Sequence, residues 1–299
     1  MAAFSAANPS VAPRAVRLGV VSYLNTLPLI EGLEACVGIE LTPAAPSKLL
    51  GLLESGAVDA ALAPVIDAMR AQSELELVPA GAIGCEGATL SVRLYSARPF
   101  DEIERVHADS DSHTSVALAK WALRERTGRV PTFVDFDARE RVESAGGAAV
   151  EWPPAMLMIG DKVVTDSPPA VRYPFQIDLG EAWRERTGLP FVYAVWMRPA
   201  DRAGGDVSPG ALDAALALLD RQRRYNASRL DWIVSRRARE RRWPEDLARE
   251  YLGRRLRYDV GERQVEAVER FFDEAAALGE IVRRPTRWAA GSASGACLG

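Results

Sequence analysis

Short apolar runs alternate with segments of helical periodicity, and this alternation limits the possible fold more than any other feature of the chain. Runs of strand type lie at 16–21, 39–43 and 58–63, and helices are expected to begin near Pro28 and Ser47. Proline suits a first helical turn, and serine is a good N-cap. Such alternation predicts parallel strands with helices on both faces of the sheet.

A second alternating block follows, and the last third of the chain has mainly helical periodicity. We expect strands at 90–95, 106–108, 132–136, 156–159 and 191–196, and helices at 115–126, 209–225, 243–251 and 262–278. The pattern predicts two α/β lobes with a ligand cleft between them. An ordinary two-domain α/β enzyme has the same pattern.

The expected division places lobe one at 16–96 and, as a helical segment, at 197–285. Lobe two covers 97–196, and the tails cover 1–15 and 286–299. The strands that end near Ser96 and Trp196 are expected to be the only covalent links between the lobes. They would form a hinge about which the cleft closes.

Composition excludes several classes of protein. A formal net charge of -4 argues against nucleic-acid binding, and the Arg-rich stretch at 221–242 is expected to be a solvated helix face. Three separated cysteines suggest neither a zinc site nor a disulfide framework.

No apolar stretch approaches the ~20 residues of a membrane span, and residues 1–15 lack the apolar core of an export signal. We therefore expect a cytoplasmic protein without a membrane partner. No Gly-rich nucleotide loop follows a strand, which argues against NAD and ATP.

Hydroxyl side chains gather where a strand gives way to a helix, in the run from Asp109 to Ser115. The amides of a first helical turn lack intrahelical partners, and together with hydroxyls and the helix dipole they favour a carboxylate. Ser112, His113, Thr114 and Ser115 are therefore candidate ligand-binding residues. The alternative is an N-cap that only stabilises the helix.

Three further loops are candidate ligand-binding segments, and those that hold Asn25 and Asp161 follow predicted strands, where α/β folds bind their ligands. Asn25, in Ser22–Thr26, can donate and accept hydrogen bonds, although an Asx turn is an equally good interpretation. In the run Cys85–Gly87, Gly87 permits close approach of the backbone, whereas Glu86 is expected to be either a ligand contact or merely solvated. Asp161 follows the strand at 156–159.

Five segments, in order along the chain, resemble the chorismate dehydratases of the futalosine route to menaquinone. They are VVSYLNTLPL at 20–29, ESGAVDAALAP at 54–64, SDSHTSVALAKWAL at 110–123, MLMIGDKVV at 156–164 and DLGEAWRERTGLPFVYAVW at 178–196. The resemblance covers almost everything between the tails. It implies a type II periplasmic-binding-protein fold whose cleft is an active site. It also implies loss of water from chorismate, without a cofactor or metal, to give 3-[(1-carboxyvinyl)oxy]benzoate.

Site residues are carried over by position. Asn25 matches the polar active-site residue of the Tyr-Leu-Asn motif, and Tyr23 accompanies it as a substrate contact. Ser112, Thr114 and Ser115 match the helix start that holds a substrate carboxylate. Cys85 stands where the resemblance leads us to expect serine, and His113 stands where it leads us to expect arginine.

Asn25 is a poor general base, so we expect it to orient the substrate or stabilise developing charge. The enolpyruvyl carboxylate of the substrate is then the hypothetical proton acceptor. Two other functions stay open. One is the sister lyase that converts cyclic dehypoxanthine futalosine to 1,4-dihydroxy-6-naphthoate, although the segment 188–196 favours the dehydratase. The other is a non-catalytic binding protein for a small carboxylate.

Overall fold

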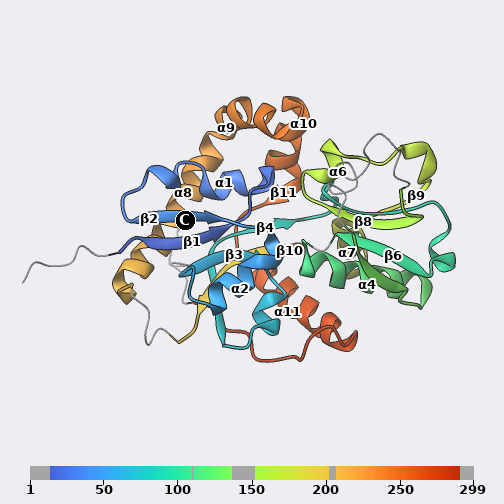
Figure 1. The fold of residues 1–299 in the computed structure, drawn as a ribbon, viewed down its shortest axis with the longest axis horizontal. Helices are drawn as coiled ribbons and strands as arrows, with labels where there is room; N and C mark the ends of the chain where they lie inside the picture. Colours follow the sequence, from blue (N-terminus) through green and yellow to red (C-terminus); the bar gives the residue numbers. More distant parts are fainter. Residues whose placement is uncertain (1–13, 110, 137–151, 202–206, 290–299) are drawn as a thin grey trace, which may run out of the picture.

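The strands of the described chain form two separate sheets, one of six strands and one of five (Figure 1). The structure is a computed structural model that describes residues 14–109, 111–136, 152–201 and 207–289. We call each sheet with its covering helices a lobe. The six-stranded sheet belongs to the first lobe and the five-stranded sheet to the second.

The sheet of the first lobe has the order β11-β4-β10-β3-β1-β2. Its strands are β1 (Val16–Val20), β2 (Ile39–Pro43), β3 (Ala60–Pro64), β4 (Leu75–Cys85), β10 (Phe191–Pro199) and β11 (Leu256–Arg257). β1 is parallel to β2 and to β3, which confirms the parallel pairing predicted from the alternation. β10 runs antiparallel to β3 and to β4, and β11 runs antiparallel to β4.

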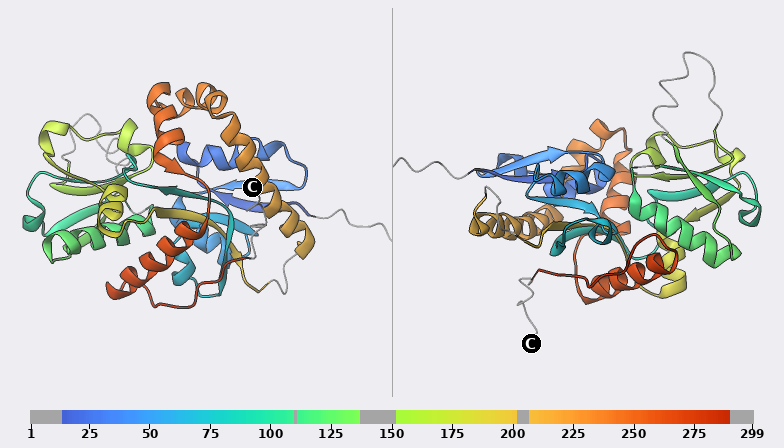
Figure 2. Two further views of the ribbon diagram at one scale, coloured as in Figure 1. Left: turned by 180° about the vertical axis from the view of Figure 1, so that it is seen from behind. Right: turned by 60° about the horizontal axis from the view of Figure 1, so that its bottom comes forward.

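Helices cover both faces of this sheet (Figures 1 and 2). α1 (Leu27–Ile30) and α8 (Pro209–Ser228) lie on one face, and α2 (Leu49–Glu54) and α11 (Glu262–Ala277) on the other. The alternation of side chains along β3 explains this arrangement, because successive residues of a strand point to opposite faces. Leu62 packs in the cluster that contains Leu216 of α8, whereas Ala61 and Ala63 pack in the cluster that contains Phe271 of α11.

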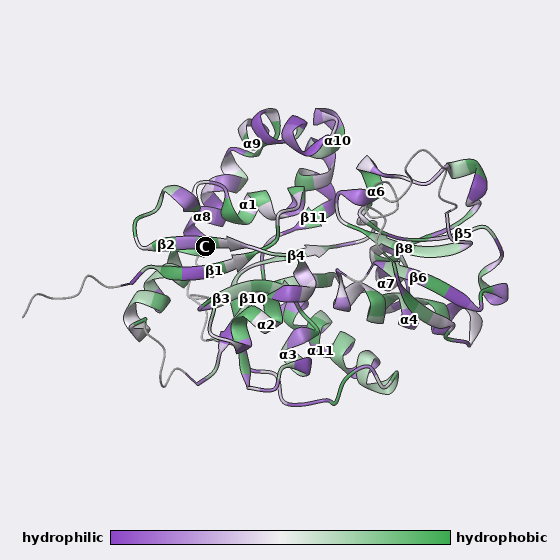
Figure 3. Ribbon diagram, in the orientation of Figure 1, coloured by the Kyte–Doolittle hydropathy of each residue, from purple (hydrophilic) through white to green (hydrophobic). Residues whose placement is uncertain are grey.

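The remaining helices of the first lobe are short. They are α3 (Asp67–Arg70), α9 (Leu230–Arg237) and α10 (Glu245–Glu250), and α10 continues as a π-helical turn over Tyr251–Arg255. Figure 3 shows many hydrophilic residues on α9 and α10. Arg236 and Arg239 of the Arg-rich stretch are exposed to solvent, as expected of a solvated helix face. No helix in the described ranges has both the length and the apolar character required to span a membrane.

The sheet of the second lobe has the order β7-β6-β8-β5-β9. Its strands are β5 (Val92–Ser96), β6 (Arg105–Asp109), β7 (Thr132–Phe136), β8 (Ala155–Ile159) and β9 (Phe175–Asp178). β6 is parallel to β7 and β8, and β5 is antiparallel to β8 and β9. α4 (His113–Thr127) and α7 (Leu179–Thr187) pack on this sheet, and the short α6 (Lys162–Thr165) follows β8.

The chain passes between the sheets at positions other than the expected Ser96 and Trp196. β5 lies inside the second sheet, so the chain leaves the first sheet after β4, at residue 86. It returns between α7 and β10, at 188–190. The sequence pattern did not predict β4, because Pro79, Gly81 and Gly84 interrupt its apolar residues.

Residues 286–289, expected to belong to a tail, run beside β4. Leu77 N donates to Arg287 O at 2.8 Å, and Ala289 N donates to Leu77 O at 2.8 Å. At the other end of the chain, the guanidinium of Arg14 binds the carboxylate of Asp59. The rest of the two expected tails, residues 1–13 and 290–299, lies outside the described residues.

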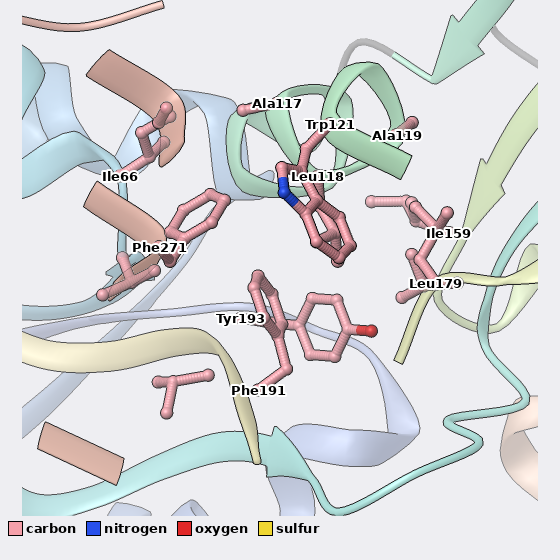
Figure 4. Packing of buried hydrophobic residues seen from close by; sticks show 14 of the residues in the cluster. Ile66, Ala117, Leu118, Ala119, Trp121, Ile159, Leu179, Phe191, Tyr193 and Phe271 are labelled. Atoms are coloured by element: carbon pink, nitrogen blue, oxygen red, sulfur yellow. The ribbon is translucent and has the colours of Figure 1, made fainter. Parts of the chain in front are cut away.

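A large hydrophobic cluster contains residues of both lobes (Figure 4). Trp121 of α4 lies 4.8 Å from Trp183 of α7, measured between ring centroids. Trp183 lies 5.2 Å from Phe191 of β10, which lies 5.0 Å from Phe271 of α11. Ring pairs in this distance range contribute attraction beyond the burial of their area. The structure therefore has the two lobes packed together.

Gly180 provides a test of the close packing at the first passage between the lobes. A Cβ atom on Gly180 would lie 2.5 Å from Cys85 Sγ and 2.6 Å from Gly87 O, whereas a Cβ atom on Gly210 would have open space within 4 Å. We expect Gly180→Ala to lower the free energy of unfolding by ~1–3 kcal/mol, because a backbone oxygen cannot move away easily. The matched control Gly210→Ala, in α8, should raise it by roughly 0.5–1 kcal/mol. Urea denaturation measures both, and equal effects would contradict the packing described.

Candidate functional site

A cavity lies between the two lobes, at the carboxyl ends of β1, β3 and β8 and beside the start of α4. The space between its lining atoms is about 560 Å³, with open solvent included. The described residues that line it are Val21, Tyr23, Asn25, Pro46, Leu62, Pro64, Ile83, Thr89, Ser91, Val92, Ser112, Ser115, Ile159, Gly160, Tyr193, Ala194 and Leu256. These side chains are apolar or carry uncharged hydroxyl and amide groups.

The loop after β1 brings Tyr23 and Asn25 to the cavity. Leu24–Thr26 form a 3₁₀ turn, closed by a bond from Thr26 N to Tyr23 O at 3.2 Å. The side-chain oxygen of Asn25 accepts a hydrogen bond from the Thr26 hydroxyl at 3.3 Å. Asn25 thus lies in a backbone turn and also lines the cavity.

The start of α4 brings Ser112 and Ser115 to the opposite wall. Ser112 is the N-cap, and its Oγ accepts from Ser115 N at 3.2 Å while donating to Ser115 Oγ at 2.8 Å. Both serines are buried. The positive end of the dipole of a 15-residue helix therefore faces the cavity together with two hydroxyls. This combination of donors suits an anionic group.

His113 and Thr114, the next two residues of the predicted helix start, contact the first lobe and do not line the cavity. Thr114 Oγ1 accepts a hydrogen bond from Ile66 N at 3.4 Å. His113 Nδ1 lies 2.7 Å from Asp67 Oδ1, and the side chain of Asp67 is fully buried. Both residues therefore join the lobes beside the cavity.

The residues of the run Cys85–Gly87 are also absent from the cavity lining. Cys85 is the last residue of β4 and is fully buried, and this burial raises the pKa of its thiol to about 12. Glu86 pairs with Arg263 at 2.6 Å and with Arg184 at 3.4 Å, and the bond from Arg263 is the main cause that lowers the pKa of Glu86. Gly87 has φ of +122°, a conformation that favours glycine.

Asp161 contacts the loop that carries Asn25. It is buried directly after Gly160, and both of its carboxylate oxygens lie 3.2 Å from Leu24 N. The predicted site residues that meet at the cavity are thus Tyr23, Asn25, Ser112 and Ser115, with Asp161 behind them.

Three hydroxyl-bearing residues of the cavity lining were not predicted: Thr89, Ser91 and Tyr193. Thr89 Oγ1 donates to Tyr193 OH at 3.4 Å, and Tyr251 OH donates to Ser91 Oγ at 2.6 Å. Burial raises the pKa of Tyr193 and that of Tyr251, so both phenols stay protonated at neutral pH. Hydroxyl side chains such as those of Thr89 and Ser91 are common beside predicted strands, so the sequence contained no signal for them. For Tyr193, the alternation of side chains along the predicted strand at 191–196 was the one available signal.

Within the part of the chain that the structure describes, no cluster of three or more His, Cys, Asp or Glu side chains is arranged to hold a metal ion.

Comparison with known proteins identifies the family. A family model described as menaquinone biosynthesis matches residues 16–277. The chain belongs to the menaquinone biosynthesis family. A relative from Thermus thermophilus, named chorismate dehydratase, is 32% identical over 193 residues, which cover 60% of this chain and 68% of the relative. The family resemblance seen in the sequence is confirmed.

Solved structures show the fold. A protein of Archaeoglobus fulgidus superposes with a TM-score of 0.69 at 14% identity, over 89% of this chain and 98% of its own. A Candida albicans protein described as having the generic periplasmic-binding-protein fold superposes with a TM-score of 0.61 at 12% identity, over 91% of this chain and 92% of its own. The predicted periplasmic-binding-protein-like fold of this family member is therefore confirmed.

The burial of Cys85 predicts a thiol without chemical reactivity. Iodoacetamide reacts with thiolates, and a fully buried thiol with a pKa of about 12 is almost entirely protonated at pH 8. We expect iodoacetamide at pH 8 to label the partly exposed Cys36 of the folded protein and to leave Cys85 unmodified. Mass spectrometry of the peptides measures both. Cys85 should react after unfolding in guanidinium chloride, and labelling of the folded protein at the rate of Cys36 would contradict its placement.

Proposed function

We propose that this member of the family is a chorismate dehydratase, a carbon–oxygen lyase of the futalosine route to menaquinone. The Thermus thermophilus relative supports the substrate. The observation that carries the proposal is the meeting of Asn25 of the first lobe with Ser112 and Ser115 of the second lobe at one cavity.

The cavity is chemically suited to chorismate, which carries two carboxylates and one ring hydroxyl on a carbocycle. Apolar residues such as Leu62 and Ile159 offer a surface for the ring, and the start of α4 offers donors for one carboxylate. Packing of the lobes around the cavity would exclude water and strengthen these polar contacts.

In the proposed reaction, the proton on the ring carbon that bears the enolpyruvyl ether is removed, and the hydroxyl of the adjacent carbon leaves with a proton as water. The remaining electron pair completes the aromatic ring of 3-[(1-carboxyvinyl)oxy]benzoate. Hydroxyls and an amide are weak bases near neutral pH. We therefore assign the removal of the ring proton to the enolpyruvyl carboxylate of the substrate. Asn25 is assigned to stabilise the charge that develops.

Turnover of chorismate tests the function, and Asn25→Ala tests the site. We expect the wild-type protein, without added cofactor, to consume the diene absorbance of chorismate and to form a benzoate. Loss of one preorganised donor should lower kcat by ~10²–10³-fold with little change in melting temperature. The control Asn25→Asp keeps the size of the side chain but replaces the amide donor with a negative charge, and it should be equally impaired.

Other outcomes of this assay would overturn the proposal. Turnover of cyclic dehypoxanthine futalosine alone would favour the sister lyase, and tight binding of chorismate without turnover would favour a binding protein. An Asn25→Ala variant within tenfold of wild type would show that Asn25 is only a turn residue.

Ser112 allows its role as N-cap to be separated from its proposed role in binding a carboxylate. Aspartate and asparagine are N-caps as good as serine, so Ser112→Asp and Ser112→Asn should both retain the helix. Only aspartate places a negative charge against the substrate carboxylate. We expect calorimetry to show the affinity for 3-[(1-carboxyvinyl)oxy]benzoate reduced at least ~10-fold more by Ser112→Asp than by Ser112→Asn, equivalent to about 1.4 kcal/mol. Equal affinities of the two variants would place the carboxylate elsewhere.

A further inference from the structure

Two consecutive residues of the first lobe, Tyr23 and Leu24, are held by the second lobe immediately before Asn25. The Tyr23 hydroxyl donates to Asp111 Oδ2 at 3.0 Å. Leu24 N is 3.2 Å from both carboxylate oxygens of Asp161. The ring of Tyr23 lies against Gly160, where an added Cβ would come within 2.9 Å of two ring carbons. The loop that presents Asn25 is therefore docked on the opposite lobe.

A buried lysine holds the acceptor of the Tyr23 hydroxyl. Lys162 Nζ lies 3.2 Å from Asp111 Oδ2 and 2.5 Å from Asp109 Oδ2. The side chains of Lys162 and Asp109 are 1% and 2% exposed, whereas that of Asp111 is 27% exposed. A buried ammonium group requires such partners. Lys162 thereby restricts the partly exposed Asp111 to one position.

Asp161 and Lys162 are neighbours in the chain, and each holds one residue of the loop. Asp161 binds Leu24 directly, and Lys162 acts on Tyr23 through Asp111. Lys162 is not among the residues that line the cavity. The contacts above supply a route by which Lys162 acts on the cavity through other side chains.

We propose that Lys162 is a positioning residue for the dehydration. It fixes Asp111, Asp111 fixes the Tyr23 hydroxyl, and the docked loop holds Asn25 at the cavity wall. This role rests on the proposed function. The competing explanation is a buried ion pair that stabilises the second lobe and has no link to the reaction.

A double-mutant cycle distinguishes the two explanations, because only the positioning role depends on the Tyr23 hydroxyl. Lys162→Met, Tyr23→Phe and the double variant are compared by kcat, KM and melting temperature. We expect Lys162→Met alone to lower kcat by about 10²-fold, the usual cost of a misplaced catalytic group. KM should change less. In the Tyr23→Phe protein, the same lysine substitution should change kcat by less than about threefold, since interacting residues are not additive. Its effect on melting temperature should persist there.

Arg198→Met is the matched control for loss of a buried cation. Arg198 is 6% exposed and pairs with Glu76 and Asp213, on the part of β10 beyond the cavity-lining Tyr193 and Ala194. Arg198→Met should lower the melting temperature. Its effect on kcat should be small, and it should be the same in the wild-type protein and in the Tyr23→Phe protein.

Lys162→Met leaves two carboxylates without their counter-ion, so Asp111→Ala provides a second route if that variant does not fold. It removes the link on a partly exposed side chain and leaves the pair between Lys162 and Asp109 intact. Its loss in kcat should match that of Tyr23→Phe, and the two losses should not add.

Turnover of chorismate by the wild-type protein is measured first. No turnover would overturn the proposed function, and the role of Lys162 in that reaction with it. Turnover with an equal effect of Lys162→Met in both backgrounds, or additive effects of Asp111→Ala and Tyr23→Phe, would overturn the positioning role alone.

Discussion

The carboxylate of Asp178 holds the backbone just after the first passage of the chain between the two lobes. It accepts hydrogen bonds from Thr89 N at 2.9 Å and Leu90 N at 2.7 Å, and also from Gly180 N at 3.1 Å in the first turn of α7. Leu90 has φ of +71°, which is unfavourable for a side chain of its kind and requires support from its surroundings. One buried side chain thus sets the conformation of the passage and the start of a helix, and with them the position of the cavity wall that Thr89 forms.

The cavity exists only because the lobes are packed together. The aromatic cluster of Trp121, Trp183, Phe191 and Phe271 joins the lobes on one side, and polar contacts such as His113 with Asp67 join them beside the cavity. A ligand that touches both walls favours this packed arrangement, whereas a ligand on one wall does not. The loop that holds Asn25 is docked on the second lobe. The proposed reaction therefore also depends on the packed arrangement of the lobes.

Much of the fold could be predicted, because hydrophobic periodicity is a local signal. The strands at 39–43 and 132–136 have the predicted bounds, and α4 was predicted to within two residues at its start. β4 was missed, since Pro79 and two glycines interrupt its pattern and only pairing with its neighbours makes it a strand. Of the candidate site, Asn25 and the serines of α4 line the cavity, whereas the run beginning at Cys85 does not.

By itself the sequence determined the α/β class, the hydroxyl-rich start of a helix and the family, because these depend on short-range patterns and on motifs in order. The tertiary structure decided which loops meet. Cys85 and Asn25 both lie at the ends of strands, yet burial removes Cys85 from the cavity and the order of the strands brings Asn25 beside Ser112. The link from Lys162 to Tyr23 likewise could not be predicted from the sequence, because 139 positions separate the two residues. Only the packing of one lobe on the other connects them, through Asp111.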